Sequence, residues 1–259
     1  MLGSLFLMTV PPLSVHVLTF ALLNPTINGS LVALLNWLWD NGSQKGVPAT
    51  LSLMLPSWSE VTEGGKHAVA FGLIQLLLMW IVPGHLHTGP IAPSGHQPTY
   101  KANGVQCYIL TIVLWAVCSL QLELFDAGFQ HTHASGMFAF LNMAAVLLVV
   151  VLYFKGRFAP STKDSGCSGN LIFDMFWGTE LYPRFGKSIW PVGWDVKMFT
   201  NCRFGLMYWG LSGLSYAAAQ YNSKGFVSSS MLVSSLVQVL YISLPCPSYS
   251  STLSSYPSA

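Results

Sequence analysis

Charge is scarce in this sequence. Asp, Glu, Lys and Arg make up 8% of its 259 residues and hydrophobic residues make up 52%, whereas soluble domains carry about 25% charged residues. A surface exposed to water needs more charge than this, so the composition excludes an ordinary soluble globule and favours a membrane protein. The formal net charge of +2 is too small and too dispersed to indicate a nucleic acid partner.

Several short motifs are also missing. No basic stretch precedes the first apolar run, so a cleavable signal peptide is not expected and the first helix would act as an uncleaved anchor. There is no Gly-x-Gly-x-x-Gly or Walker sequence, so a dinucleotide would need another architecture. The cysteines form no Cys-x-x-Cys pair, and we expect buried or reduced thiols.

The histidines do not form a recognisable metal motif. His85 and His87 are two residues apart, and so are His131 and His133. That spacing does not put two ligands on one face of a helix, which needs a separation of three or four residues. The histidine boxes of membrane desaturases are absent as well. The sequence therefore predicts no metal site.

Long apolar runs are abundant instead. A spanning helix needs about 20 mostly apolar residues, and the segments that fit are 4–23, 68–83, 104–125, 136–153 and 204–221, with 230–244 as most of a sixth. Residues 30–39 are too short to cross and should lie at the interface, with Trp37 and Trp39 at headgroup depth. The predicted fold is all-α, a polytopic transmembrane helical bundle with five full spanning helices and a partial sixth.

Basic residues orient this bundle. Residues 153–203 carry seven of the eleven Lys and Arg residues, and Lys101 would lie on the same side. Lys45, Lys66 and Lys224 would lie on the other side, which gives a bias of eight to three. By the positive-inside rule, the N-terminus and residues 153–203 are expected in the cytoplasm and residues 125–135 in the lumen.

Residues 169–184, GNLIFDMFWGTELYPR, form an unusual connecting segment because aromatic residues surround Asp174, Glu180 and Arg184. A segment this aromatic is expected to fold against the bundle through Phe173, Phe176 and Trp177. We favour a structural role for the charges, an ion pair of Arg184 with a carboxylate, over direct chemistry. Replacing Arg184 with Ala should then lower the folded yield.

The spacing of Gly169, Asp174, Gly178, Pro183 and Arg184 resembles the first signature of the membrane sterol reductases, a family that includes the Δ7- and Δ14-reductases and the lamin B receptor. A second segment resembles the family's Tyr-Lys-x-Asn-Gly element through Tyr100, Lys101, Asn103 and Gly104. The resemblance covers about residues 84–242. Tyr-Lys-Ala-Asn-Gly and Gly-Thr-Glu-Leu-Tyr-Pro-Arg, which contains Glu180, favour the plant-type Δ7 branch.

The resemblance implies an oxidoreductase of the endoplasmic reticulum membrane. Such an enzyme reduces a sterol ring double bond with NADPH, which supplies the hydride while the protein positions it. Its partners would be the sterol substrate and membrane lipid. In the family, the cofactor-binding and reacting groups lie chiefly in the C-terminal half, so neither catalytic nor cofactor-binding residues are assigned here.

The resemblance ends near residue 242. Residues 1–242 read as the N-terminal half of a sterol-reductase-like membrane domain, and residues 243–259 read as a disordered tail rich in Ser and Pro. Residues 189–193 look like a small insertion. We therefore expect these 259 residues alone not to reduce a sterol. The alternatives are a sterol Δ14-reductase, a non-catalytic scaffold or sterol-binding fragment, and an unrelated transporter, which the absence of inverted repeats disfavours.

Overall fold

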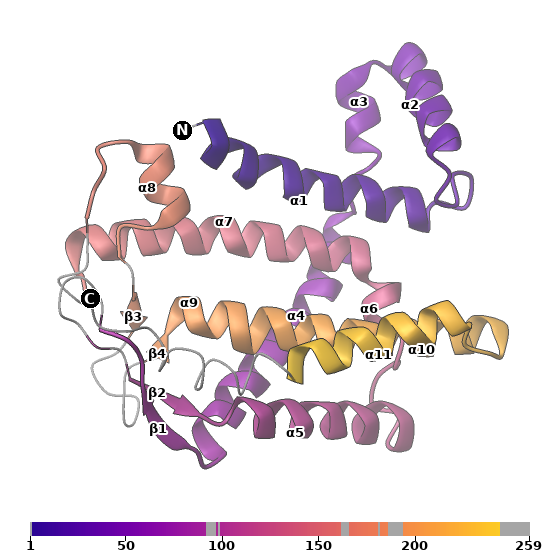
Figure 1. Cartoon of the computed structure of the whole chain (residues 1–259). Coiled ribbons are helices and arrows are strands. Elements are labelled where there is room, and N and C mark those ends of the chain that lie inside the picture. The colour runs from indigo at the N-terminus through magenta and orange to yellow at the C-terminus, as the bar shows by residue number, and fades with distance from the viewer. Residues whose placement is uncertain are drawn as a thin grey trace. The chain divides into compact units, whose positions relative to one another are not determined.

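The structure is a computed structural model that describes residues 2–91, 97, 99–161, 166–180, 182–185 and 194–243. Most of the described chain is helical (Figure 1). It divides into two compact units. The first contains Met1–Ala68, His133–Val151 and Cys167–Gly178, and the second contains Val69–Thr132, Leu152–Gly166 and Thr179–Ala259. Each unit is described below by itself.

Four helices among the described residues are long and apolar enough to cross a membrane. They are α1 (Leu2–Leu23), α4 (Trp58–Ile81), α5 (Gly104–Ala116) with its continuation η1 (Val117–Gln121), and α7 (Ala134–Phe158). No more than 28% of the apolar window of any of them is buried. Apolar helices that expose this much surface need lipid as their solvent. The predicted class, a polytopic helical membrane protein, is confirmed.

The predicted fifth and sixth spans differ from these four. The fifth forms α10 (Met207–Lys224), which is preceded by the π-helix η2 (Phe199–Leu206). It is 18 residues long, but Gln220, Asn222 and Lys224 reduce its apolar character and it is not among the four. The partial sixth forms the shorter α11 (Ser229–Ser243). The two helices pack closely, since the Ser235 hydroxyl donates to the Gly213 carbonyl at 2.7 Å.

The boundaries of α4 also differ from the prediction. The helix begins at Trp58, ten residues before the expected start at residue 68. The added turns carry Glu60, Glu63 and Lys66, so hydropathy alone does not find them. The interfacial segment predicted for residues 30–39 is the first part of α2 (Leu31–Lys45), which is followed by α3 (Val47–Ser52).

Two small antiparallel ribbons join the helices, a feature that an all-α prediction omits. In the first, β1 (His85–Thr88) pairs with β2 (Thr99–Ala102). In the second, β3 (Arg184–Phe185) pairs with β4 (Trp194–Asp195). The remaining elements are the short helices α6 (Phe129–Thr132), α8 (Leu171–Trp177) and α9 (Val196–Met198). The predicted insertion at 189–193, and the predicted tail apart from Ser243, lie outside the described residues.

Candidate functional site

The first half of the signature segment forms α8. Asn170 is the N-cap, and its side-chain oxygen accepts from the Phe173 amide at 3.2 Å. Gly169 and Gly178 flank the helix with φ values of 83° and 80°, where a side chain would be strained. Asp174 is buried and accepts from the amide and the hydroxyl of Ser168 at 2.9 and 2.6 Å. These residues of the first unit therefore fold the segment locally.

The aromatic side chains of α8 are more exposed than predicted. Phe173 and Trp177 are 40% and 59% exposed, while Phe176 is half-buried and its ring lies 5.2 Å from that of Trp177. The backbone of α8 packs on α1 within the first unit. The helix thus packs on α1, but much of the surface of Phe173 and Trp177 stays exposed.

Glu180 is the centre of the second half of the segment. Its side chain is almost completely buried. One carboxylate oxygen accepts from the Lys155 ammonium at 2.7 Å, and the other accepts from the Ser161 amide at 2.5 Å. Because Lys155 lies in the last turn of α7, this ion pair ties the signature segment to the end of a spanning helix. Lys197 adds a bond to the Glu180 carbonyl at 2.7 Å.

A glycine permits this close approach. A Cβ atom on Gly156 of α7 would clash with the Thr179 hydroxyl and would lie 3.3 Å from the Glu180 Cβ. The Thr179 carbonyl accepts from the Gly166 amide at 3.0 Å. Gly156 therefore leaves room for residues 179 and 180 beside the helix.

Arg184 does not form an ion pair with Glu180, because the Glu180 carboxylate pairs with Lys155. The backbone of Arg184 accounts for its position instead. Its amide and carbonyl both bond to the Ser161 hydroxyl at 3.0 Å, and its strand partner is Asp195. Buried Pro183 accepts from the Val196 amide. Lys155, which is distant in sequence, takes the Glu180 carboxylate, while the charge of Arg184 acts on the Asp195 carboxylate. A structural pairing of Arg184 with a carboxylate therefore stays a prediction.

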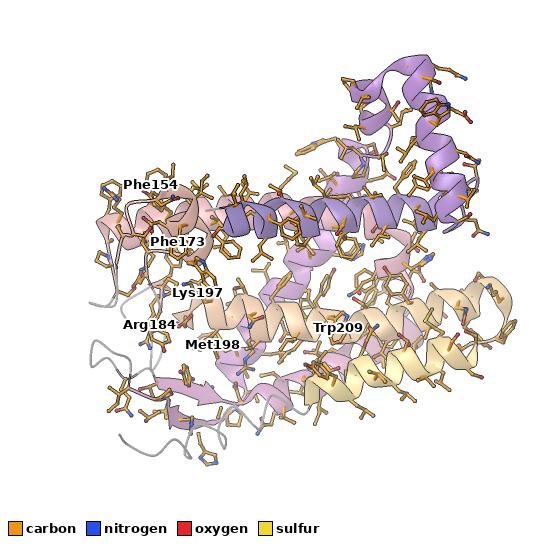
Figure 2. The ribbon with its side chains drawn as sticks, turned by 45° about the horizontal axis from the view of Figure 1, so that its top comes forward. Phe154, Phe173, Arg184, Lys197, Met198 and Trp209 are labelled. Carbon is orange, nitrogen blue, oxygen red and sulfur yellow. The ribbon has the colours of Figure 1, made fainter. Side chains whose placement is uncertain are left out.

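Asp195 and Lys197 are partly buried charges beside this strand pair. Figure 2 labels Arg184, Lys197 and Met198, which lie near the start of α9. Burial raises the pKa of Asp195, and the Met198 amide and the charge of Arg184 oppose that shift. Burial lowers the pKa of Lys197, while Asp195 and Glu180 raise it. Asp195 also caps α9 by accepting from the Met198 amide at 3.0 Å.

The Tyr-Lys-x-Asn-Gly element of residues 100–104 caps the end of α4. Asn103 is fully buried, and its side-chain Nδ2 donates to the backbone carbonyls of Met79 and Val82 at 3.2 and 2.7 Å. Lys101 in β2 donates to the Trp80 carbonyl at 3.0 Å. The cation suits the negative end of the helix dipole. Gly104 begins α5 directly after Asn103, so this element joins two spanning helices.

Arg203 completes that cap from the π-helix η2. It donates to the side-chain oxygen of Asn103 and to the Lys101 carbonyl. Tyr100 lies across the ribbon, where a Cβ on Gly89 would clash with its ring. Sequence reasoning missed Arg203, Lys155 and Ser161 as members of the site. The basic residues Lys155 and Arg157, just after the apolar run of α7, were the available signal for Lys155.

Four basic residues of the site already have protein partners. Lys101, Lys155, Lys197 and Arg203 donate to oxygen atoms of the protein, whereas phosphate recognition needs donors directed at the ligand. In the described ranges, no three His, Cys, Asp or Glu side chains are placed to hold a metal ion. The arrangement is a pair of structural clamps. Lys101, Asn103 and Arg203 form one at the end of α4, and Lys155, Ser161 and Glu180 form the other at the end of α7.

Several known proteins are similar to this chain in sequence. A model of the Ergosterol biosynthesis ERG4/ERG24 family matches residues 50–248. The chain is 36% identical to the 7-dehydrocholesterol reductase of Arabidopsis thaliana over 219 residues, which are 83% of this chain and 47% of that protein. It is 31% identical to the Delta(14)-sterol reductase of Arabidopsis thaliana over 202 residues, 74% of this chain and 49% of that protein.

A vertebrate relative aligns over a shorter stretch. The 7-dehydrocholesterol reductase of Danio rerio is 29% identical over 180 residues, 65% of this chain and 37% of that protein. The chain spans about half the length, or less, of the curated relatives it matches. The family model nevertheless covers most of the chain, including both clamps and the spanning helices from α4 onward. This chain therefore belongs to the Ergosterol biosynthesis ERG4/ERG24 family of sterol reductases.

Proposed function

We propose that this chain contributes to an NADPH-dependent sterol Δ7-reductase of the endoplasmic reticulum membrane, acting on 7-dehydrocholesterol-like sterols. The observation that carries the proposal is the pair of clamps, which are built from the two segments that resemble the Δ7 branch. The greater identity to a protein named 7-dehydrocholesterol reductase than to one named Delta(14)-sterol reductase, 36% against 31%, supports the same branch.

The reaction would add a hydride to one alkene carbon and a proton to the other. NADPH would supply the hydride when bound. The contribution of the described residues is positional. Lys155 and Glu180 hold the signature segment at the end of α7, and Asn103 and Arg203 hold the junction of α4 and α5. Reacting groups must be held within about 3–3.5 Å of each other, so fixed helix ends serve such a reaction.

Two chimeras test the branch. In the first, residues 1–242 replace the matching part of the Arabidopsis 7-dehydrocholesterol reductase, and in the second they replace the matching part of the Arabidopsis Delta(14)-sterol reductase. Each is expressed in a yeast strain that accumulates the corresponding substrate. We expect the first chimera to convert Δ5,7-sterols to Δ5-sterols and the second to be inactive.

The other outcomes separate the alternatives. Activity of the second chimera alone would favour a Δ14-reductase. If both chimeras accumulate as folded membrane proteins without activity, a scaffold or sterol-binding role gains support. The unfused chain is expressed in parallel. Conversion by it alone would contradict the expectation that it is inactive, and would place the reacting groups among residues 100–103 and 174–203.

A further inference from the structure

The helix α2 has an exposed apolar face that the proposed function does not use. Leu31, Leu35 and Trp39 are 69%, 56% and 77% exposed. They follow one another at intervals of four residues, so they form one row along the helix. Val32, which is 68% exposed, lies beside this row. A soluble surface rarely leaves such a row uncovered.

The other two faces of α2 have different surroundings. Leu34 is buried, and Trp37 and Leu38 pack beside it against α1. A second exposed row is polar and consists of Asn36, Asp40 and Gln44. The helix therefore has a face on the protein, an apolar face and a polar face, which is the pattern of a helix at a lipid–water boundary.

The contacts of α2 with α1 fix how far α2 lies from the end of α1. Leu34 and Trp37 lie in one cluster with Val17, Phe20 and Ala21 of α1, and the Trp37 ring is 4.8 Å from the Phe20 ring. These α1 residues precede the end of the helix at Leu23 by two to six positions, or about 3–9 Å at 1.5 Å per residue. Helices lying on membranes bury their apolar face by about 5–10 Å.

The direction of α2 agrees with that depth. Within the first unit, α2 crosses the end of α1 steeply rather than running beside it (Figure 1). When α1 spans the bilayer, α2 then lies close to the membrane plane. The neighbouring surface of α1 is apolar as well, since Leu18 and Leu22 are 60% and 66% exposed. Apolar side chains are thus exposed on α2 and near the end of α1.

We propose that α2 is an in-plane membrane anchor. Leu31, Val32, Leu35 and Trp39 insert into the boundary between headgroups and acyl chains, in the leaflet where α1 ends, while Asn36, Asp40 and Gln44 face water. The occupant of the apolar face is the host phospholipid bilayer. The exposed apolar side chains near the end of α1, together with the separate polar row on α2, favour lipid over a second copy of the chain.

Site-specific labels test this assignment on the full chain. An environment-sensitive fluorescent amino acid is placed singly at positions 35 and 39, and at positions 36 and 44 as matched controls on the same helix. The proteins are reconstituted into phosphatidylcholine vesicles. Quenching is measured with lipids that carry a nitroxide near the top of the acyl chain and with iodide in the surrounding water. Proteins solubilised from the vesicles are sized by light scattering.

We expect nitroxide quenching to be at least about threefold stronger at positions 35 and 39 than at 36 and 44, with iodide showing the opposite order. Strong iodide quenching at 35 and 39 would overturn the proposal in favour of water exposure. Protection from both quenchers, together with a dimer, would overturn it in favour of a second copy. Should labelled proteins misfold, Leu35→Glu and Asn36→Glu in the same vesicles give a second reading. A glutamate at 35 that lowers the unfolding midpoint in the vesicles no more than a glutamate at 36 contradicts lipid insertion.

Discussion

Glu180 and Lys155 form a buried ion pair, with side chains that are 1% and 10% exposed and 2.7 Å apart. A second ion pair, Glu63 with Lys66, is 2.6 Å apart but 50% and 68% exposed. The nitrogen–oxygen distances of the two ion pairs are similar, so the pairs differ mainly in burial. Removing one partner of a buried pair leaves an uncompensated charge, whereas exposed pairs contribute little because water screens both charges.

We therefore expect Glu180→Ala to lower the free energy of unfolding by about 3–5 kcal/mol. Lys155→Met combined with Glu180→Ala should recover part of this loss, because no charge is then left alone. Folded protein remaining after heating in detergent provides the measurement. Glu63→Ala is the matched control and should leave the midpoint nearly unchanged. Equal effects of the two single substitutions would refute the importance of burial here.

We expect the side chain of Arg184 to contribute less to the folded yield than the sequence suggested. Both its backbone amide and its carbonyl are held by Ser161, and these bonds survive replacement of the side chain. Arg184→Ala is still expected to lower the folded yield, because it removes the cation beside Asp195, but by less than Glu180→Ala. Comparing the two variants in one membrane preparation checks the order.

Asp195 gives the second unit a pH dependence. Burial raises the pKa of its carboxyl group in the folded state above the ordinary value of 3.8. The folded protein then holds a proton that the unfolded chain has lost, so this residue stabilises the fold at low pH and that stability is lost as pH rises through the folded pKa. Asp195→Asn keeps an acceptor for the Met198 amide and removes this titration.

The expected result is a flatter stability profile for Asp195→Asn than for the parent between pH 4 and neutrality, roughly the window above the normal carboxyl pKa. Unfolding midpoints in detergent at a series of pH values provide the comparison. Asp40→Asn, an exposed carboxyl on α2, is the control. Parallel profiles for all three proteins would show that the Asp195 pKa is not raised.

At the scale of elements, glycines allow α4 and α7 to cross closely within the first unit. A Cβ on Gly136 of α7 would clash with the Glu60 carbonyl of α4, and a Cβ on Gly64 would clash with the Met137 amide. Both obstacles are backbone atoms and cannot rotate away. Close crossings through small residues are common between membrane helices, where van der Waals packing supplies the attraction.

Gly136→Ala should therefore destabilise the protein by at least about 1–3 kcal/mol through overpacking. Gly72→Ala on α4 is the control, because its Cβ would meet the Phe204 ring at an ordinary 3.4 Å. Alanine loses less conformational entropy than glycine when a helix forms, so that change should be neutral or stabilising by up to about 1 kcal/mol. Both variants are compared by heating in detergent. A neutral Gly136→Ala would mean that the two helices can separate at no cost.

Sequence reasoning reached the helices but not their connections. Apolar length reveals α1, α5 and α7 because each buries itself in lipid, and it missed the first turns of α4 because Glu60 and Lys66 lie there. The clamp residues meet only because the folded chain brings distant segments together. Glu180 meets Lys155 across 25 residues, and Arg203 meets Asn103 across 100. No local spacing encodes such a partner, so the sequence identified the signature residues but not Lys155 as the partner of Glu180.

The whole molecule has a predicted orientation that the number of spanning helices supports. Among the described residues, four helices are long and apolar enough to span, namely α1, α4, α5 with η1, and α7. An even number of spans up to the end of α7 would return the chain to the side on which it began. The N-terminal end of α1 and the residues after α7 are thus expected on one side, and the turn before α7 on the other. The bias of eight basic residues to three places the first side in the cytoplasm.

Glycosylation acceptors inserted singly near Ser135 and near Lys163 test this orientation in microsomes. We expect the acceptor near Ser135 to be modified, because residues 125–135 would face the lumen, and the acceptor near Lys163 to remain unmodified. A third acceptor near Gly46, between α2 and α3, should also be modified, since it follows one span. The reverse pattern would invert the orientation. Modification at both Ser135 and Lys163 would mean that α7 does not cross the membrane.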